Sequence, residues 1–256
     1  MLKTKRLEVI ENHLYKDGSV VVSQLSKELN VTEETIRRDL EELEKQDKLK
    51  RVHGGAFLPD TFDREVPIKI RESIYNTEKV IIATCCLNFI KNGDSILLDS
   101  STTAIQLAKL IKESQKQITV ITNSLKVSQI FENYSLIKLI SLGGNLRLAS
   151  NSFVGNLTTN NLEEYFVDKS FISCSGLDIN FGITDNSEQE AKVRKKMLIH
   201  SSSKFLIVDH TKFDSPSVYK ICNLSEIDTI ITDTIVKSNW KEKLTSLGIE
   251  IVQCKQ

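Results

Sequence analysis

Apolar residues recur at every third or fourth position through the first part of the chain. This spacing places side chains on one face of an α-helix. It is found over residues 3–15, 20–29 and 33–43, which predicts three amphipathic helices whose apolar faces pack together. Basic residues of the first helix, Arg6 among them, are expected on its outer face. The apolar positions are Leu7, Ile10, Leu14, Val22, Leu25, Leu29, Ile36, Leu40 and Leu43.

The third predicted helix begins at Glu33. Thr32 can accept a backbone N–H as its N-cap, and Glu33 and Glu34 then fall in the first turn, where the helix dipole favours acids. Arg38 points away from the apolar face and Arg37 lies beside it. The helix therefore displays a pair of guanidinium groups.

Only Asn30 and Val31 separate the second predicted helix from the third. Two short helices joined this closely, the second bearing arginines, are typical of a helix-turn-helix, whose second helix enters the major groove of DNA. This arrangement is expected over about residues 20–39. The arginines would contact guanine edges or phosphates, and the start of the helix could hold a phosphate.

Basic and apolar residues alternate directly after the third helix. Lys48, Lys50 and Arg51 flank Leu49 and Val52, and the run ends in a histidine and two glycines. The pattern predicts a β-hairpin wing that carries cations to the sugar-phosphate backbone. A short strand is expected beside this wing over residues 20–22.

Each of these residues could instead have a purely structural role. A pair of arginines on a helix is also typical of a solvated face, where Glu41, Glu42 and Glu44 could pair with it. A single histidine in a loop is more often structural than a ligand. The ordered combination of helices and basic hairpin favours DNA. The candidate DNA-binding residues are Ser23 as a helix cap, Thr32, Glu34, Thr35, Arg37, Arg38, Lys50, Arg51, His53 and Gly54.

The pattern changes after residue 75, where short aliphatic runs alternate with amphipathic segments. Unbroken aliphatic strands separated by helices are typical of a mainly parallel sheet covered on both faces. Residues 59–74, with two of the chain's three prolines, are expected to form a linker between domains at 1–58 and 75–256. The predicted strands cover residues 95–99, 118–122, 136–141, 170–175, 204–209, 229–234 and 250–254.

Polar residues follow five of these strands, and the carboxyl ends of parallel strands are where such sheets bind ligands. Hydroxyls and N–H groups that open a helix suit a phosphate. The polar segment at any one strand end could simply cap a helix or form a turn. Because the five polar strand ends are expected to meet at one edge of the sheet, they predict a site for a phosphorylated polyol. Lys212 would neutralise phosphate, while Asp99, Asn123 and Asp178 would bond sugar hydroxyls, and glycines would let backbone approach the ligand. The candidate effector-binding residues are Asp99, Ser100, Ser101, Thr102, Thr103, Thr122, Asn123, Ser124, Gly143, Gly144, Arg147, Gly176, Asp178 and Lys212.

The composition of the chain excludes some classes of protein but does not by itself indicate a function. The formal net charge is zero, and residues 1–58 hold eleven Lys and Arg against eleven Asp and Glu, so the DNA prediction depends on where the charges lie. The amino terminus has no signal-peptide pattern and no apolar run approaches a membrane span, which predicts a cytoplasmic protein with no membrane partner. Five cysteines without a C-x-x-C pair argue against disulfides and a metal site, and no cofactor is expected.

The segment TIRRDLEELEKQDKLKRVHGGA resembles the DNA-binding domain of the DeoR family of bacterial transcriptional regulators, whose signature joins a TIRRDL helix to an R-x-HGGA wing. Elements of that family's sensor domain also have counterparts, at residues 78–79, 99–103, 122–124, 143–147 and 209–213. Ser101 departs from the pattern, because the family often has glycine there, so the loop gains a side chain and a hydroxyl close to the expected phosphate.

This resemblance implies a small winged helix-turn-helix domain followed by an α/β sensor domain similar in fold to ribose-5-phosphate isomerase. It implies a homodimer or homotetramer that binds double-stranded operator DNA, mostly as a repressor of carbohydrate uptake or catabolism, and is released by a phosphorylated sugar. An isomerase-like enzyme carrying a DNA-binding module, or an activator built from the same parts, is the alternative. The glycine-rich segment with its lysine that the isomerase uses is absent after Asp178, so no catalytic residues are expected.

Overall fold

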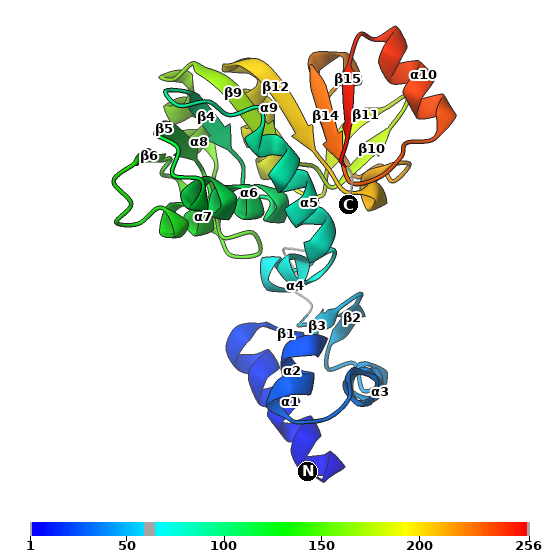
Figure 1. Ribbon diagram of the computed structural model, residues 1–256. Helices are drawn as coiled ribbons and strands as arrows, with labels where there is room; N and C mark the ends of the chain where they lie inside the picture. Colours follow the sequence, from blue (N-terminus) through cyan, green and yellow to red (C-terminus); the bar gives the residue numbers. More distant parts are fainter. Residues whose placement is uncertain (1, 59–64, 255–256) are drawn as a thin grey trace. The chain divides into compact units, whose positions relative to one another are not determined.

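The computed structural model describes residues 2–58 and 65–254 of the chain, in two compact units, Met1–Asn76 and Thr77–Gln256 (Figure 1). Each unit has its own apolar core, and each is described by itself. None of the helices in these described ranges is long and apolar enough to cross a membrane.

The first unit packs three helices on a small antiparallel sheet. The side chains predicted to face inward, such as Ile10, Ile36 and Leu40, are at most 1 % exposed, so the helical periodicity is confirmed. The short strand expected beside the wing is also present, and the strand order is β1-β3-β2. The elements are α1 (Lys3–Asp17), β1 (Ser19–Val21), α2 (Val22–Glu28), α3 (Glu33–Lys45), β2 (Lys50–Val52) and β3 (Gly55–Phe57).

Two expectations for this unit are wrong. Ser23 lies inside α2 and does not cap it; the N-cap is Val21, and the N–H of Val22 donates to the carbonyl of Gly54 at 2.9 Å. Arg6 is buried, because its guanidinium donates to both oxygens of Asp39 on α3, with 2.9 Å between Nη2 and Oδ1. A pattern of apolar residues alone does not reveal a buried ion pair.

Part of the segment expected as a linker is folded. Helix α4 (Ile68–Ser73) follows Pro67, and its Ile68 and Ile70 are buried. Ile70 joins a cluster with Val21 and Phe57 of the strands. Residues 59–64 of the predicted linker lie outside the described residues.

The second unit is built on a parallel sheet of seven strands in the order β15-β14-β12-β9-β4-β5-β6. The predicted strands and their parallel arrangement are confirmed, and the α/β fold class with them. Its strands are β4 (Ser95–Leu98), β5 (Ile118–Thr122), β6 (Ile137–Ser141), β9 (Val167–Ile172), β12 (Ser201–Ile207), β14 (Thr229–Thr232) and β15 (Glu250–Gln253).

Helices and two smaller antiparallel sheets surround this sheet. The smaller sheets pair β7 with β8 and order the others β10-β11-β13; the sequence pattern did not reveal them. These elements are α5 (Asn76–Leu87), α6 (Thr102–Glu113), α7 (Leu125–Ile130), β7 (Asn145–Arg147), β8 (Ser152–Val154), α8 (Asn156–Glu163), β10 (Gly176–Asp178), β11 (Gly182–Asp185), α9 (Glu188–Ile199), the 3-10 helix η1 (His210–Lys212), β13 (Tyr219–Cys222), the 3-10 helix η2 (Leu224–Glu226) and α10 (Ser238–Ser246).

The order of the strands explains why polar residues converge. β12, β9, β4, β5 and β6 are consecutive neighbours and parallel, so their carboxyl ends share one edge of the sheet. The five polar tips predicted from the sequence therefore lie side by side along this edge.

Candidate DNA interface and sensor site

Helix α3 begins as the sequence predicts. The hydroxyl of Thr32 accepts the backbone N–H of Thr35 at 3.2 Å, and the two threonine hydroxyls lie 2.9 Å apart. Glu33 and Glu34 occupy the first turn. The cap fixes the end of the helix that a recognition helix would present to a base edge or a phosphate.

Both arginines of α3 are exposed and each is paired within the helix. Arg37 Nη2 lies 2.6 Å from Glu33 Oε2, and Arg38 Nε lies 3.3 Å from Glu34 Oε1. The side chains of Arg37 and Arg38 are 54 % and 77 % exposed. Because exposed ion pairs contribute little free energy, about 0 to 1 kcal/mol, a phosphate or guanine could replace the glutamates.

The wing is a hairpin closed by a two-residue turn. Lys50 pairs with Phe57 and Val52 with Gly55, so the turn consists of His53 and Gly54. The φ angle of Gly54 is +83°, a left-handed value that glycine adopts most easily.

Glu44 of α3 holds the wing against the recognition helix. Its carboxylate accepts the backbone N–H of Arg51 at 2.8 Å and Nε of the same residue at 2.6 Å, and these hydrogen bonds lower the pKa of Glu44. A cavity of about 160 Å³ separates the two elements, and its lining includes Arg37, Arg51 and His53. The two arginines in this lining are both paired with glutamates of α3, and the rest of it includes valine, leucine and glycine.

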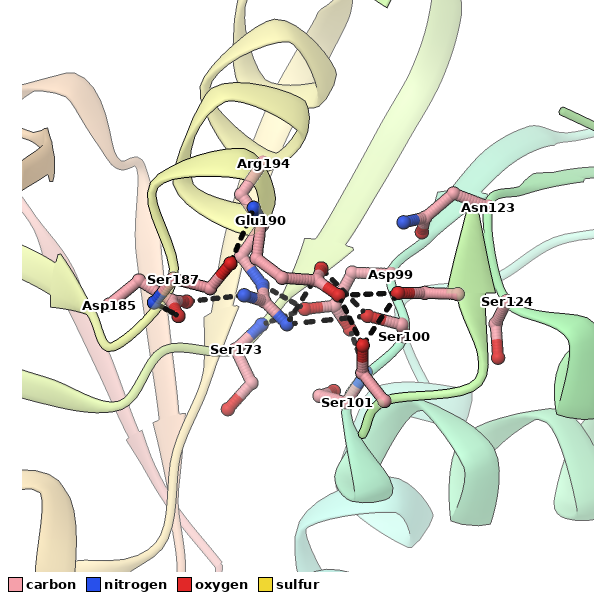
Figure 2. A network of polar contacts seen from close by, with 12 residues as sticks. Asp99, Ser100, Ser101, Asn123, Ser124, Ser173, Asp185, Ser187, Glu190 and Arg194 are labelled. Carbon is pink, nitrogen blue, oxygen red and sulfur yellow. Dashed lines mark hydrogen bonds and ion pairs between the residues drawn. The ribbon is translucent and has the colours of Figure 1, made fainter. Parts of the chain in front are cut away.

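Arg194 is the centre of a buried polar network at the carboxyl edge of the large sheet (Figure 2). Its guanidinium comes from α9 and is 7 % exposed. Nε donates to Asp99 Oδ2 at 2.8 Å, Nη1 donates to the carboxylate of Asp185, and Glu190 Oε2 lies 3.7 Å from Nη2. One guanidinium thus holds three carboxylates, from the loop after β4, the end of β11 and its own helix.

Glu190 extends the network toward β7 and β8. Its Oε1 accepts hydrogen bonds from the hydroxyl of Ser150 at 2.7 Å and from that of Ser152, and Arg147 Nη1 lies 3.8 Å away. Its Oε2 accepts from Ser100 at 3.0 Å. The effector-binding candidates Ser100 and Arg147 are therefore brought together by a residue that the sequence analysis did not select.

The network keeps its charges despite burial. Burial opposes ionisation of Glu190, but the charge of Arg194 and the hydroxyls of Ser152 and Ser150 outweigh it, so the pKa of Glu190 is lowered. Burial likewise opposes the charge of Arg194, but the surrounding carboxylates outweigh it and raise the pKa of Arg194. Glu190 and Arg194 are therefore both charged at neutral pH.

Asp99 is occupied by protein donors. Its Oδ1 accepts the backbone N–H of Ser101 at 3.0 Å, and its Oδ2 accepts the N–H of Ser173 at 2.9 Å as well as Nε of Arg194. The carboxylate predicted to bond a sugar hydroxyl thus fixes the loop that leads into α6.

Two of the predicted hydroxyl groups cap helices. Ser101 accepts the N–H of Ala104 at the start of α6, at 3.1 Å, and Ser124 accepts the N–H of Val127 at the start of α7. Thr102 and Thr103 lie buried in the first turn of α6. These residues form helix ends at the sheet edge, where backbone N–H groups favour an anion.

Asn123 has one amide atom satisfied and one not. Its Nδ2 donates to the carbonyl of Phe153 at 3.0 Å, while its buried Oδ1 has no hydrogen-bond partner among the residues described. Thr122 beside it is fully engaged, since its hydroxyl donates to the carbonyl of Leu98 at 2.7 Å and accepts the N–H of Ser124 at 3.0 Å. Figure 2 places Asn123 on the same side of the sheet edge as the Asp99 loop.

Two of the three predicted glycines serve a different purpose from the one expected. A Cβ on Gly144 would lie 2.0 Å from Thr158 Oγ1, and one on Gly176 would lie 1.5 Å from the carbonyl oxygen of Ser215. At both positions the missing side chain admits the protein's own atoms. A Cβ on Gly143 would meet nothing within 4 Å, so this glycine borders open space.

Asp178 and Lys212 lie in elements that follow β9 and β12. Asp178 Oδ1 accepts the N–H groups of Asn180 and Phe181 at 2.9 and 2.7 Å and so closes the turn between β10 and β11. Lys212 ends η1 and is half-buried. Burial raises the pKa of the Cys174 thiol and the charge of Lys212 opposes this rise, so the ammonium lies near the end of β9.

The sequence analysis missed the residues on which this edge depends. One signal was present: a helix of mixed polarity carries a Glu and an Arg four positions apart, among buried positions. The missed residues are Ser150, Ser152, Asp185, Glu190 and Arg194. Among the described residues, no group of three or more His, Cys, Asp or Glu could hold a metal ion.

Known proteins resemble the chain along most of its length. It is 40 % identical to the uncharacterised helix-turn-helix-type transcriptional regulator YulB of Bacillus subtilis, over 91 % of this chain and 90 % of that protein. It is 36 % identical to the lactose phosphotransferase system repressor of Lactococcus lactis, over 96 % of each. It is 32 % identical to the L-fucose operon activator of Haemophilus influenzae, over 93 % of this chain and 94 % of that protein.

A solved structure and two family models complete the comparison. Ribose 5-phosphate isomerase A of Methanocaldococcus jannaschii aligns over 54 % of this chain and 55 % of that one, with 17 % identity and a TM-score of 0.41, too low to support a functional conclusion. Residues 6–62 match the DeoR-like helix-turn-helix domain, and residues 75–234 match the DeoR C-terminal sensor domain. Together with the winged helix-turn-helix and the seven-stranded α/β unit, these matches show that the chain belongs to the DeoR family of transcriptional regulators.

Proposed function

We propose that this chain is an operator-binding repressor of genes for carbohydrate uptake or catabolism, and that a phosphorylated sugar releases it from DNA. Two relatives that match nearly the whole chain support a role in carbohydrate metabolism, since one is named for a lactose system and one for L-fucose. The repressor role follows the lactose relative, whereas the fucose relative is named an activator. An in vitro transcription assay with and without the protein tests whether it represses or activates transcription.

Binding to the operator would use the exposed arginines of α3 and the cations of the wing. Replacing Arg38 with alanine removes the most exposed guanidinium of the helix, at 77 %, and leaves the apolar face untouched. Loss of a bidentate base contact costs about 1 to 3 kcal/mol, which is about 5- to 150-fold in affinity. Unchanged affinity of Arg38→Ala in a gel-shift titration would remove the arginine from the interface.

The unpartnered Oδ1 of Asn123 carries the sensor proposal. A buried acceptor without a donor costs about 1 to 3 kcal/mol, and a sugar hydroxyl is a donor of the right kind. Helix ends at Ser101 and Ser124, together with Lys212, supply the positive potential that a phosphate requires. One edge thus offers both an acceptor for hydroxyls and donors for an anion.

The carboxylates at this edge support binding without turnover. A general base must be free to accept a proton from the substrate. Asp99, Asp185 and Glu190 are all bound to Arg194 and to further donors, and the charge of Arg194 with neighbouring hydroxyls lowers the pKa of Glu190 despite its burial. We therefore propose a sensor and not an isomerase-like enzyme.

A thermal-shift screen of the purified protein against phosphorylated sugars and their unphosphorylated counterparts tests the sensor. At a hundredfold excess over the dissociation constant, a ligand stabilises the fold by about 2.7 kcal/mol. For a unit of this size that corresponds to a rise in Tm of roughly 5 to 10 °C. Trp240, the chain's one tryptophan, lies buried in the sensor unit and reports its unfolding. Stabilisation by unphosphorylated sugars alone would refute phosphate recognition.

We further propose that the chain acts as a homodimer or homotetramer, because paired half-sites multiply the contacts with DNA. Sedimentation equilibrium of the full chain measures the oligomeric state directly. A monomer at all concentrations that bind DNA would contradict this part of the proposal.

A further inference from the structure

We infer that Tyr75, with the helix α4 that leads to it, positions the wing for contact with DNA. This inference rests on the proposed role of the wing in binding the sugar-phosphate backbone. It assigns a task to a segment that the sequence pattern identifies only as a linker.

The ring of Tyr75 stacks on the ring of His53 at the tip of the wing. The ring centroids are 5.6 Å apart and the planes differ by 10°. His53 is the first residue of the two-residue turn between β2 and β3, so the stack holds the tip itself. Offset parallel stacking of this kind is favourable beyond the area that it buries.

Tyr75 adopts an unfavourable backbone conformation to make this contact. Its φ angle is +51°, a left-handed value that side chains with a Cβ adopt at a cost in free energy. Such a conformation persists where the surroundings hold it in place. The ring stack and the preceding residue, Ile74, supply contacts of this kind.

Ile74 packs directly beneath the turn of the wing. A Cβ built on Gly54 would lie 2.9 Å from Ile74 Cγ1, so the glycine lets the turn settle on this side chain. One turn earlier in α4, Ile70 lies in the cluster with Phe57 of β3, and a Cβ on Gly55 would come within 3.3 Å of it. The strand and the turn of the wing are therefore both supported by residues 68–75.

The turn of the wing is also held by the helix-turn-helix. The carbonyl of Gly54 accepts the N–H of Val22, the first residue of α2, at 2.9 Å. The turn is thus held both by α2 and by the Ile74 and Tyr75 side chains. Removing the Tyr75 ring should let the tip move away from the position in which it meets a phosphate.

The salt dependence of DNA binding distinguishes a positioned wing from a merely stable one. Each phosphate contact contributes about 0.9 to the slope of log affinity against log salt, whereas a smaller fraction of folded protein leaves the slope unchanged. The probe is a short duplex selected by the wild-type chain from a random-sequence pool. Affinity is measured by fluorescence anisotropy from about 50 to 200 mM salt.

Four variants are compared with the wild type. Tyr75→Ala and Tyr75→Gly both remove the ring. Glycine also relieves the strain of the positive φ, so this variant tests the ring even if alanine impairs folding. Tyr75→Phe keeps the ring without the hydroxyl. Tyr15→Ala removes a tyrosine that is 70 % exposed on α1 of the same unit, as the matched control.

We expect Tyr75→Ala and Tyr75→Gly to bind the duplex roughly 2- to 10-fold more weakly, as loss of an aromatic pair predicts, with a slope reduced by about one phosphate contact. Tyr75→Phe should restore both values, and Tyr15→Ala should leave both unchanged. Wild-type slopes for both ring-free variants would overturn the inference, whether or not their affinity falls.

A further variant separates this inference from the proposed function. Lys50→Ala removes an exposed cation of β2 and should lower the slope by about 0.9 if the wing meets phosphates. An unchanged slope for Lys50→Ala refutes the role of the wing itself. A lowered slope for Lys50→Ala with a wild-type slope for Tyr75→Gly refutes only the positioning by Tyr75.

Discussion

Replacement of Arg194 by methionine should destabilise the sensor unit more than any surface change. Methionine keeps much of the volume and removes the charge that holds three buried carboxylates. Removal of one partner from a buried ion pair typically costs about 3 to 5 kcal/mol, because the remaining charge is left uncompensated.

The hydrogen bonds that remain place the expected cost near the lower limit. Without Arg194, Asp99 still accepts the N–H groups of Ser101 and Ser173, and Glu190 still accepts several serine hydroxyls. We therefore expect a loss of about 3 kcal/mol in the free energy of unfolding. With a urea m-value of about 2 kcal/mol/M, the midpoint should fall by roughly 1.5 M.

Tryptophan fluorescence in urea provides the assay. The indole of Trp240 is fully buried, donates to Asp214 Oδ1 at 2.7 Å and meets the ring of Phe213 edge-on at 5.1 Å. Because it is the chain's one tryptophan, its emission follows the sensor unit without interference from the DNA-binding unit.

Lys192→Met is the matched control, since Lys192 lies on the same helix with its side chain 67 % exposed and pairs only at the surface with Glu188. It should change the free energy of unfolding by no more than about 0.5 kcal/mol. If Arg194→Met moved the midpoint no further than this control, the network would not contribute to stability and the reasoning would be wrong.

The pH dependence of the free energy of unfolding provides an independent test of this electrostatic argument. In the wild type the pKa of Glu190 is lowered, so its contribution is complete above the unfolded-state pKa of about 4.3 and is lost as the pH falls through the lower folded-state value. Without Arg194, burial should raise the pKa values of the carboxylates. Protonation at lower pH would then remove their uncompensated charge and restore part of the lost stability. The difference in the free energy of unfolding between the wild type and Arg194→Met should therefore be smaller at about pH 5 than at pH 7.

Three further predictions concern caps, ion pairs and thiols. Thr32→Ala should lower the stability of the first unit by about 1 kcal/mol through loss of the α3 cap, seen as a lower Tm by circular dichroism; an unchanged Tm would show that the cap is dispensable. Asp39→Asn should cost about 3 kcal/mol because the buried Arg6 loses the negative charge that faces it, whereas Glu42→Gln, at an exposed pair, should cost under about 1 kcal/mol. Burial raises the pKa of Cys222 to about 12, so iodoacetamide at pH 8 should modify it far more slowly than an unfolded thiol; equal rates by mass spectrometry would contradict its burial.

The sequence predicted those parts of the fold that depend on local periodicity. The apolar faces of α1 to α3, the cap at Thr32 and the seven aliphatic strands all follow from side chains a few positions apart. The antiparallel hairpin of β7 and β8 was missed because its strands have three residues each, too few to establish a pattern. Helix α4 was missed because the prolines before it are also typical of a linker.

The sensor edge could be located from the sequence, but its chemistry could not. Strand ends in a parallel sheet meet by topology, which is why the polar tips at Asp99 and Asn123 fall together. The partner of Asp99 is Arg194, 95 positions further along the chain, and no local pattern reveals such a pair. Serine and threonine at a strand end also fit helix caps and ligand donors equally well, and for Ser101 and Ser124 the cap is observed.

The glutamates that pair with the arginines of α3 have a consequence for how the protein searches a genome. Residues 1–58 carry equal numbers of acidic and basic residues, so long-range attraction to arbitrary DNA is weak. A genome offers about 10⁶ to 10⁹ non-specific sites that compete with the operator, and protein bound to these sites is not available to the operator. On the proposed role of α3, Glu33 and Glu34 would occupy Arg37 and Arg38 until a matching sequence displaces them, which would reduce that retention. A few copies per cell would then keep an operator occupied, because discrimination, and not bare affinity, sets the fraction bound.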